Sequence, residues 1–133
     1  MSIFAAAMSK HILYIGIGTN LENSEIAIRW AERKLAEAFR GEQRFSTPQR
    51  TEPIGINCPR MFTNQVAWVE TTVPTTFIRP LLKSLERQFG RKPEDLAKGL
   101  VKLDLDLLWM DGEVLRQEDW ERDYVQSAVA ELS

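Results

Sequence analysis

The segment LDLDLLWMDG, residues 103 to 112, limits the fold of this chain more than any other. Leucine and aspartate alternate in it, so on a β-strand the leucines at 103, 105 and 107 share one face. Asp104 and Asp106 then share the opposite face. Unpaired ionised carboxylates are costly to bury. The segment therefore predicts a sheet with one face packed under helices and an uncovered face that carries two neighbouring aspartates.

The other segments alternate between strand and helix patterns in a fixed order. Strands are expected at 11–18, 44–53 (interrupted at Pro48), 61–73 and 100–110, and helices at 19–41, 74–90 and 118–132. Asn20 or Asn23 is expected to cap the first helix and Gly41 to end it. This βαββαβ order predicts a ferredoxin-like α+β sandwich, with an antiparallel sheet, both crossover helices on one face and an additional C-terminal helix. A single domain over 1–133 is expected, with residues 1–9 disordered.

Composition excludes several classes of protein. The chain carries 17 Lys and Arg against 19 Asp and Glu, so no overall basic field attracts nucleic acid or anionic membranes. No segment reaches the roughly 18 apolar residues that a membrane span needs. One cysteine, Cys58, excludes an internal disulfide, and with His11 as the single histidine it also excludes a Cys/His zinc site. We expect a soluble cytoplasmic protein that binds small molecules, and the oligomeric state stays open.

Two like charges on neighbouring positions of one face repel each other unless a cation lies between them. Magnesium suits such a pair, because it accepts one or two carboxylates together with phosphate oxygens and waters. Basic residues in the flanking segments fit a magnesium–polyphosphate ligand: Arg91, Lys92, Lys98, Lys102, Arg116 and Arg122. The alternative is a half-exposed strand whose aspartates and flanking cations are simply solvated, and the spacing alone leaves both interpretations open.

Five segments stand out in order along the chain: YIGIGTNLEN (14–23), RTEPIG (50–55), FTNQVAWVET (62–71), LERQFGR (85–91) and LDLDLLWMDG (103–112). Together they resemble successive motifs of the 6-hydroxymethyl-7,8-dihydropterin pyrophosphokinase family over about residues 12–112. The resemblance implies the ferredoxin-like fold. It also implies transfer of the pyrophosphoryl group of ATP to the pterin hydroxymethyl group in folate biosynthesis, which leaves AMP.

The resemblance assigns roles to individual residues. It implies that two magnesium ions bind Asp104 and Asp106, which with Arg91 form the catalytic set, and that ATP is the co-substrate. The implied pterin site consists of the rings of Phe62 and Tyr124, the amide of Asn64 and the backbone around Thr51, Ile54 and Gly55. The implied nucleotide contacts are Glu86, Arg91, Lys98, Leu107 and Arg122.

This chain departs from the family pattern in two places. Val101 occupies the position of a second catalytic arginine, and Lys98 that of a tryptophan. Lys102 would point to the opposite face of the strand. Either Lys98 or Lys102 could instead reach in from a flexible loop, but a lysine does not replace the bidentate arginine fork. The proline–histidine segment that follows the last strand in the family is absent. A catalytically weakened or inactive paralogue that binds pterin or nucleotide is therefore an alternative, and a generic ferredoxin-like interaction domain is another. The loop over 91–102 is expected to be flexible and to close over bound nucleotide.

Overall fold

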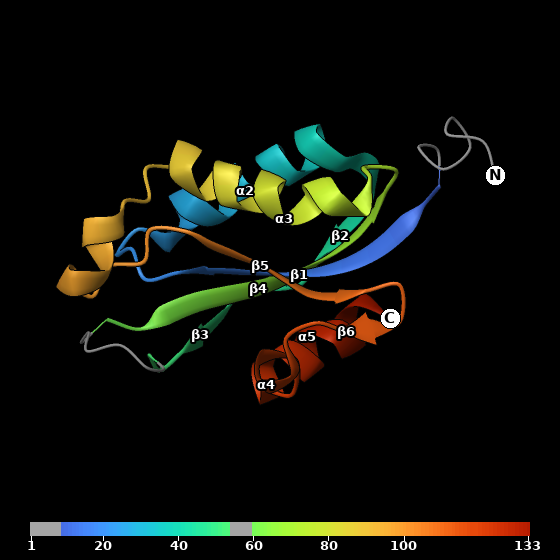
Figure 1. The fold of residues 1–133 in the computed structure, drawn as a ribbon. Helices are drawn as coiled ribbons and strands as arrows, with labels where there is room; N and C mark the ends of the chain where they lie inside the picture. The colour runs from blue at the N-terminus through green and yellow to red at the C-terminus, as the bar shows by residue number, and fades with distance from the viewer. Residues whose placement is uncertain (1–8, 54–59) are drawn as a thin grey trace.

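The computed structural model describes residues 9–53 and 60–133, and these form one antiparallel sheet with helices on both faces (Figure 1). The strands are β1 (His11–Thr19), β2 (Arg40–Phe45), β3 (Gln49–Thr51), β4 (Phe62–Thr71), β5 (Asp104–Met110) and β6 (Glu113–Val114). The helices are α2 (Ser24–Phe39), α3 (Thr75–Gln88), the 3-10 helix η1 (Pro93–Lys98), α4 (Gln117–Trp120) and α5 (Asp123–Leu132). The strand order is β2-β4-β1-β5-β6, and β3 pairs with β4. The predicted α+β architecture is confirmed.

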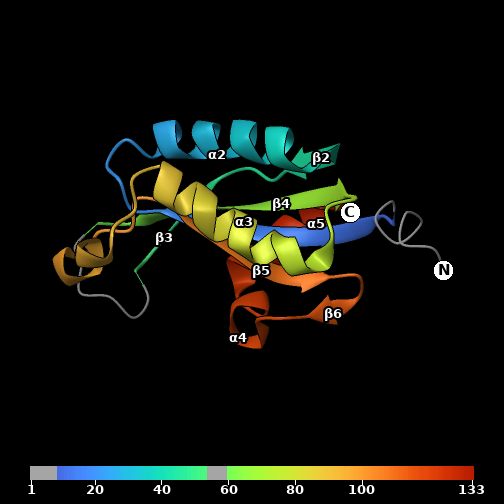
Figure 2. The same ribbon diagram turned by 45° about the horizontal axis from the view of Figure 1, so that its top comes forward.

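The two crossover helices cover one face of the sheet, as the leucine spacing predicted. Leu103, Leu105 and Leu107 are buried in a core that they share with apolar residues of α2 and α3. Figure 2 shows α2 and α3 side by side over this face. Area removed from water stabilises this layer by roughly 25 cal/mol per Å² of apolar surface. The core therefore fixes which way β5 presents its alternate side chains.

The opposite face is not uncovered, and this differs from the prediction. The C-terminal segment breaks at Glu121 and Arg122 into α4 and α5, which lie on the other side of the sheet from α2 and α3 (Figure 1). A second apolar cluster joins α5 to the sheet: Val66, Leu108, Val125, Ala128 and Leu132. Val125 and Ala128 lie three positions apart, on one face of the helix. This cluster hides the part of the face beyond the aspartates and leaves a pocket over the aspartates themselves.

Two helix boundaries also differ from expectation. Asn23 precedes α2 but makes no side-chain capping hydrogen bond, and the helix ends at Phe39 with Arg40 in the left-handed conformation. Gly41 is needed for another reason, because a Cβ there would lie 1.8 Å from the backbone oxygen of Glu70. The glycine thus permits close approach of β2 to β4. None of the helices in the described ranges is both long and apolar enough to cross a membrane.

Candidate active site

A pocket lies between the sheet and the α4–α5 segment. Its floor is formed by β1, β4 and β5, and two glycines of β1 keep it open. A Cβ on Gly18 would lie 3.1 Å from Asn64 Oδ1, and one on Gly16 would lie 3.3 Å from Leu108. Larger residues would therefore crowd the floor at both positions, and the missing side chains leave space for a ligand on the sheet.

Asp104 and Asp106 line this pocket side by side, on the face that the sequence predicted. Each carboxyl group shifts the pKa of the other. Burial and the neighbouring Asp104 raise the pKa of Asp106 to about 7. Burial alone would raise the pKa of Asp104 as well, but hydrogen bonds to Asp106 and Arg91 lower it. The pair thus carries a concentrated negative charge that favours either a proton or a metal cation.

Cationic side chains approach the pair from both sides of β5. Arg91 Nη1 lies 3.0 Å from Asp104 Oδ1. Asp106 Oδ1 lies 3.6 Å from Lys83 Nζ and 3.5 Å from Arg116 Nη1. The sequence marks Arg116 only as a nearby basic residue, and it does not point to Lys83 at all. It offers no signal for Lys83, because the i,i+3 spacing of this residue from Glu86 is that of an ordinary helix surface pair.

Glu86 organises these cations from beneath the pocket. Its side chain is buried, with 4% exposure, and does not line the pocket. Its carboxylate accepts a hydrogen bond from Leu105 N at 2.7 Å and one from Lys83 Nζ at 3.0 Å, and it lies 3.3 Å from Arg91 Nη1. Burial alone would lower the pKa of Arg91, but its hydrogen bond to Asp104 and the charges of Glu86 and Asp104 outweigh that effect and raise it. Glu86 therefore holds Arg91 and Lys83 in place beside the aspartates.

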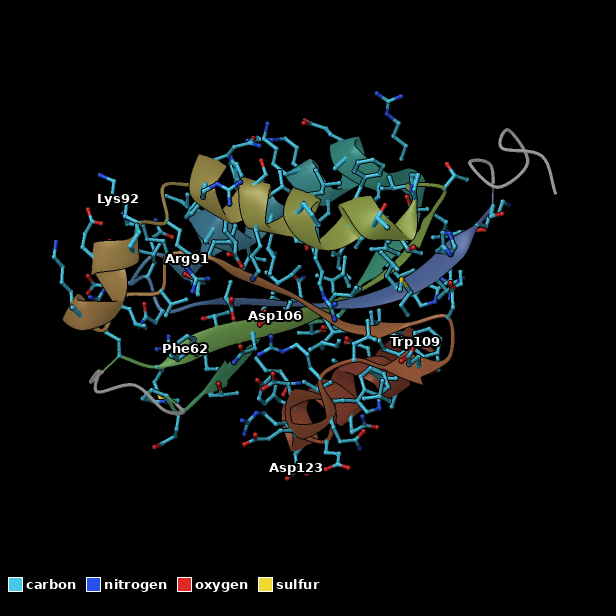
Figure 3. All side chains as sticks on the ribbon, in the orientation of Figure 1. Phe62, Arg91, Lys92, Asp106, Trp109 and Asp123 are labelled. Carbon is cyan, nitrogen blue, oxygen red and sulfur yellow. The ribbon has the colours of Figure 1, made fainter. Side chains whose placement is uncertain are left out.

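The predicted pterin residues converge at the same pocket. Phe62 from β4 and Tyr124 from α5 line it together with Thr51 and Asn64. Asn64 Nδ2 donates a hydrogen bond to Thr51 Oγ1, which sets the orientation of the amide. In Figure 3, Phe62 and Arg91 lie toward the η1 end of the sheet, and Asp106 lies between that end and α4. The predicted residues Ile54 and Gly55 lie outside the described part of the chain.

The predicted nucleotide residues divide into two groups. Arg91 and Arg122 line the pocket. Lys98 is exposed on η1 and, like Glu86, does not line it. Leu107 is 5% exposed in the core under the helices, because its position on β5 gives it the face opposite to Asp106. The side chains of Leu107 and Lys98 therefore both lie outside this pocket.

Side-chain contacts join the 91–102 segment, which the sequence predicts to be a flexible loop, to the rest of the fold. Asn20 is not a helix cap; its Nδ2 donates to Gly99 O at 2.7 Å and its Oδ1 accepts from Val101 N at 2.8 Å. Lys102 Nζ donates to Gly90 O at 2.8 Å and lies 3.3 Å from the buried Asp95. Lys102 is thus turned away from the pocket, as predicted, and the apolar Val101 lines the pocket instead.

Residues 14–133 match the sequence profile of the family described as 7,8-dihydro-6-hydroxymethylpterin-pyrophosphokinase. The match includes all but the first 13 of the 133 residues. The chain belongs to this family. The pterin pyrophosphokinase family transfers a pyrophosphoryl group from ATP to hydroxymethyldihydropterin in folate synthesis. The resemblance read from the motifs up to residue 112 is confirmed, and the match extends through α4 and α5.

The donor set agrees with the metal that the pterin pyrophosphokinase family uses. Within residues 9–53 and 60–133 no group of three or more His, Cys, Asp or Glu side chains could hold a metal ion. Two carboxylates suffice for magnesium when phosphate oxygens and waters complete its coordination. Asp104 and Asp106 supply such a pair on the pocket floor. The pocket therefore fits magnesium brought in with a phosphorylated ligand better than a permanently bound structural metal.

Proposed function

We propose that this chain is an active, magnesium-dependent transferase that moves the terminal pyrophosphoryl group of ATP to 6-hydroxymethyl-7,8-dihydropterin. The observation that carries the proposal is the convergence of two ligand chemistries in one pocket. Asp104, Asp106 and Arg91 line it as a charged group suited to polyphosphate, and Phe62 and Tyr124 line it as aromatic surfaces suited to a flat heterocycle. The two groups are adjacent, as a transfer between two substrates requires.

The charged group would bind and orient the triphosphate. Two magnesium ions, when bound at Asp104 and Asp106, would supply positive charge that neutralises the phosphates and makes the β-phosphorus more electrophilic. Arg91, oriented by Glu86, contributes a guanidinium whose fork matches phosphate oxygens. These groups stabilise charge on the transferring phosphates, which is the main catalytic contribution available to such a site.

The aromatic group would place the acceptor. Phe62 and Tyr124 would stack on the two faces of the pterin ring, and the Asn64 amide would hydrogen-bond its edge. The pterin hydroxyl oxygen then forms a bond to the β-phosphorus as the bond from that phosphorus to the α,β-bridging oxygen breaks. AMP leaves with that oxygen and the hydroxyl proton is released, so atoms and charge balance.

Turnover tests the proposal directly. The chain incubated with ATP, magnesium and the hydroxymethyl pterin should release AMP, and Asp106→Ala should abolish that release. Glu37→Ala is a matched control, because Glu37 is an exposed carboxylate on α2. AMP release that is unchanged in Asp106→Ala would overturn the mechanism.

The second candidate is a pterin- or nucleotide-binding paralogue without turnover, and Val101 at the position of the second arginine favours it. Loss of a catalytic contact to transferring charge typically costs roughly 10²–10³ in rate. Calorimetry with the pterin and a non-hydrolysable ATP analogue, separately and together, distinguishes the two. Binding of both ligands without AMP release at any ATP concentration would support the paralogue.

A further inference from the structure

One carboxylate on α4 holds two arginines at the pocket. Asp119 Oδ2 lies 2.8 Å from Arg116 Nε, and Asp119 Oδ1 lies 3.3 Å from Arg122 Nε. All three residues line the pocket. The hydrogen bond that Arg116 donates to Asp119 is the first cause of the raised pKa of Arg116. Asp119 thus joins two guanidinium groups that are six positions apart in the sequence.

The contacts of Asp119 leave the outer ends of both guanidinium groups available. Because each carboxylate oxygen meets an Nε atom, the Nη atoms have other neighbours: Arg116 Nη1 lies 3.5 Å from Asp106, and Arg122 Nη2 lies 3.7 Å from Glu118. Glu118 is 91% exposed, so its ion pair with Arg122 contributes little to stability. The Arg116 side chain is 49% exposed. Arg122 can therefore exchange a weak partner for a stronger one, and the half-exposed Arg116 can turn its Nη atoms toward a ligand in the pocket.

The facing wall of the pocket provides few cations. Val101 on this wall is apolar. Lys102 forms an ion pair with Asp95 and donates a hydrogen bond to Gly90 O, and Lys98 is exposed outside the pocket. Arg91 is the guanidinium on that side, and it lies against Asp104. A triphosphate bound over the two aspartates would meet Arg91 on one flank and the α4 segment on the other.

We propose that Arg116, held by Asp119 beside Arg122, completes a second phosphate clamp in this chain and supplies the charge that Val101 cannot. The inference rests on the proposed function, and it assigns phosphate binding to Arg116 and a positioning role to Asp119. Arg116 exchanges Asp106 for a phosphate oxygen when nucleotide and magnesium enter. A guanidinium held by a carboxylate loses less conformational freedom on binding than a free one, so the clamp is preorganised.

Binding measurements separate phosphate contact from a general structural role. Calorimetry with a non-hydrolysable ATP analogue and magnesium should show roughly 10- to 100-fold weaker binding for Arg116→Gln, because a charge-assisted hydrogen bond is lost. Affinity for AMP should change less than about threefold and for the pterin less than about twofold, since neither carries the β- and γ-phosphates. Arg116→Lys should lie between, because lysine keeps the charge but not the fork.

Two further variants complete the test. Asp119→Asn should weaken binding of the ATP analogue by roughly three- to tenfold, and its effect should be smaller in an Arg116→Gln background, because Asp119 acts partly through Arg116. Arg29→Gln is the matched control, since Arg29 is exposed on α2 and forms an ion pair there with Glu25. Circular dichroism and thermal midpoints should confirm that each variant is folded.

The possible outcomes distinguish this inference from the proposed function. Equal affinity of wild type and Arg116→Gln for the ATP analogue would overturn the clamp, whether or not AMP is released. A wild type that binds the analogue through Arg116 but releases no AMP would uphold the clamp and contradict the proposed catalysis. Parallel loss of AMP, pterin and ATP-analogue binding in both Arg116→Gln and Arg116→Lys would show a structural role and also overturn the clamp.

Discussion

Asn20, which follows β1, holds Val101 in place across 81 positions of sequence, with its Oδ1 atom 2.8 Å from the backbone nitrogen of Val101. The amide is fully buried and also donates to the backbone oxygen of Gly99. One side chain therefore satisfies two backbone groups of the segment that leads into β5. This contact fixes the wall of the pocket opposite α4.

Replacement of Asn20 by alanine should destabilise the protein. It leaves a buried N–H and a buried C=O without their partner, and each such group costs about 1–3 kcal/mol. We expect the free energy of unfolding, measured by urea titration, to fall by roughly 2–4 kcal/mol. Asn23→Ala is the matched control, because Asn23 makes no capping hydrogen bond and should change stability by less than about 0.5 kcal/mol. Equal effects of the two substitutions would contradict the assigned role of Asn20.

Glu86→Gln should reduce both stability and nucleotide binding. The neutral amide turns an NH₂ group toward Arg91 or Lys83, which are donors themselves, so the buried contacts cannot all be kept. We expect the free energy of unfolding to fall by about 1–3 kcal/mol and binding of the ATP analogue to weaken. Glu37→Gln, which alters an exposed helix pair with Lys34, should change either quantity little. A Glu86→Gln variant as stable as wild type would show that the charge of Glu86 is not needed.

The raised pKa of Asp106 predicts a pH dependence in magnesium-free buffer. The folded state holds the proton up to about pH 7, whereas an aspartate in the unfolded chain releases it near pH 4. The folded state therefore binds more protons in this window, so this contribution to stability falls as the pH rises through the folded pKa. Asp106→Asn has no titrating group at this position and so lacks this pH-dependent loss of stability. The free energy of unfolding of the variant minus that of wild type should therefore rise between about pH 5 and pH 8.

Urea unfolding in EDTA at several pH values measures this difference. Asp104 has a lowered pKa, so its own contribution changes at lower pH and does not cancel the effect. Magnesium and the proton compete for the same oxygens, so magnesium binding in the presence of nucleotide should also tighten from about pH 6 to pH 8. An unfolding free energy with the same pH profile in wild type and Asp106→Asn would show that Asp106 is ionised throughout.

The two ligands should bind cooperatively. Arg122 ends the break between α4 and α5, and Tyr124, two positions later, lines the same pocket. Phosphate bound at Arg122 would restrict this junction and hold the Tyr124 ring where the pterin stacks. We expect the pterin to bind roughly 5- to 50-fold tighter when magnesium and the ATP analogue are present.

Calorimetric titration of pterin with and without the nucleotide gives this ratio directly. Tyr124→Leu should lower the ratio, because the ring that links the two ligands is removed. Phe39→Leu is a suitable control, since Phe39 is an aromatic residue buried in the core between α2 and the sheet. Equal pterin affinities with and without nucleotide would show that the sites are independent and would favour the binding paralogue.

The sequence alone determined the strand and helix order and the face on which the aspartates lie. Strand alternation repeats every two residues and helix spacing every three to four, so local patterns decide which side chains share a side. Leu103 and Leu105 had to face the helices because leucine is stabilised by burial, and Asp104 and Asp106 followed on the opposite face. The five motifs then identified the family without any coordinates.

Tertiary structure decided what surrounds those aspartates. Asn20 and Val101 are far apart in sequence, as are Asp106 and Lys83, and no local periodicity reports a contact between distant segments. The break between α4 and α5 likewise depends on packing against the sheet, where Val125 lies in one apolar cluster with Leu108 and Val66. Arg116 becomes part of the pocket only because that packing brings α4 beside β5. The contribution of its charge depends on the charged residues that folding places next to it.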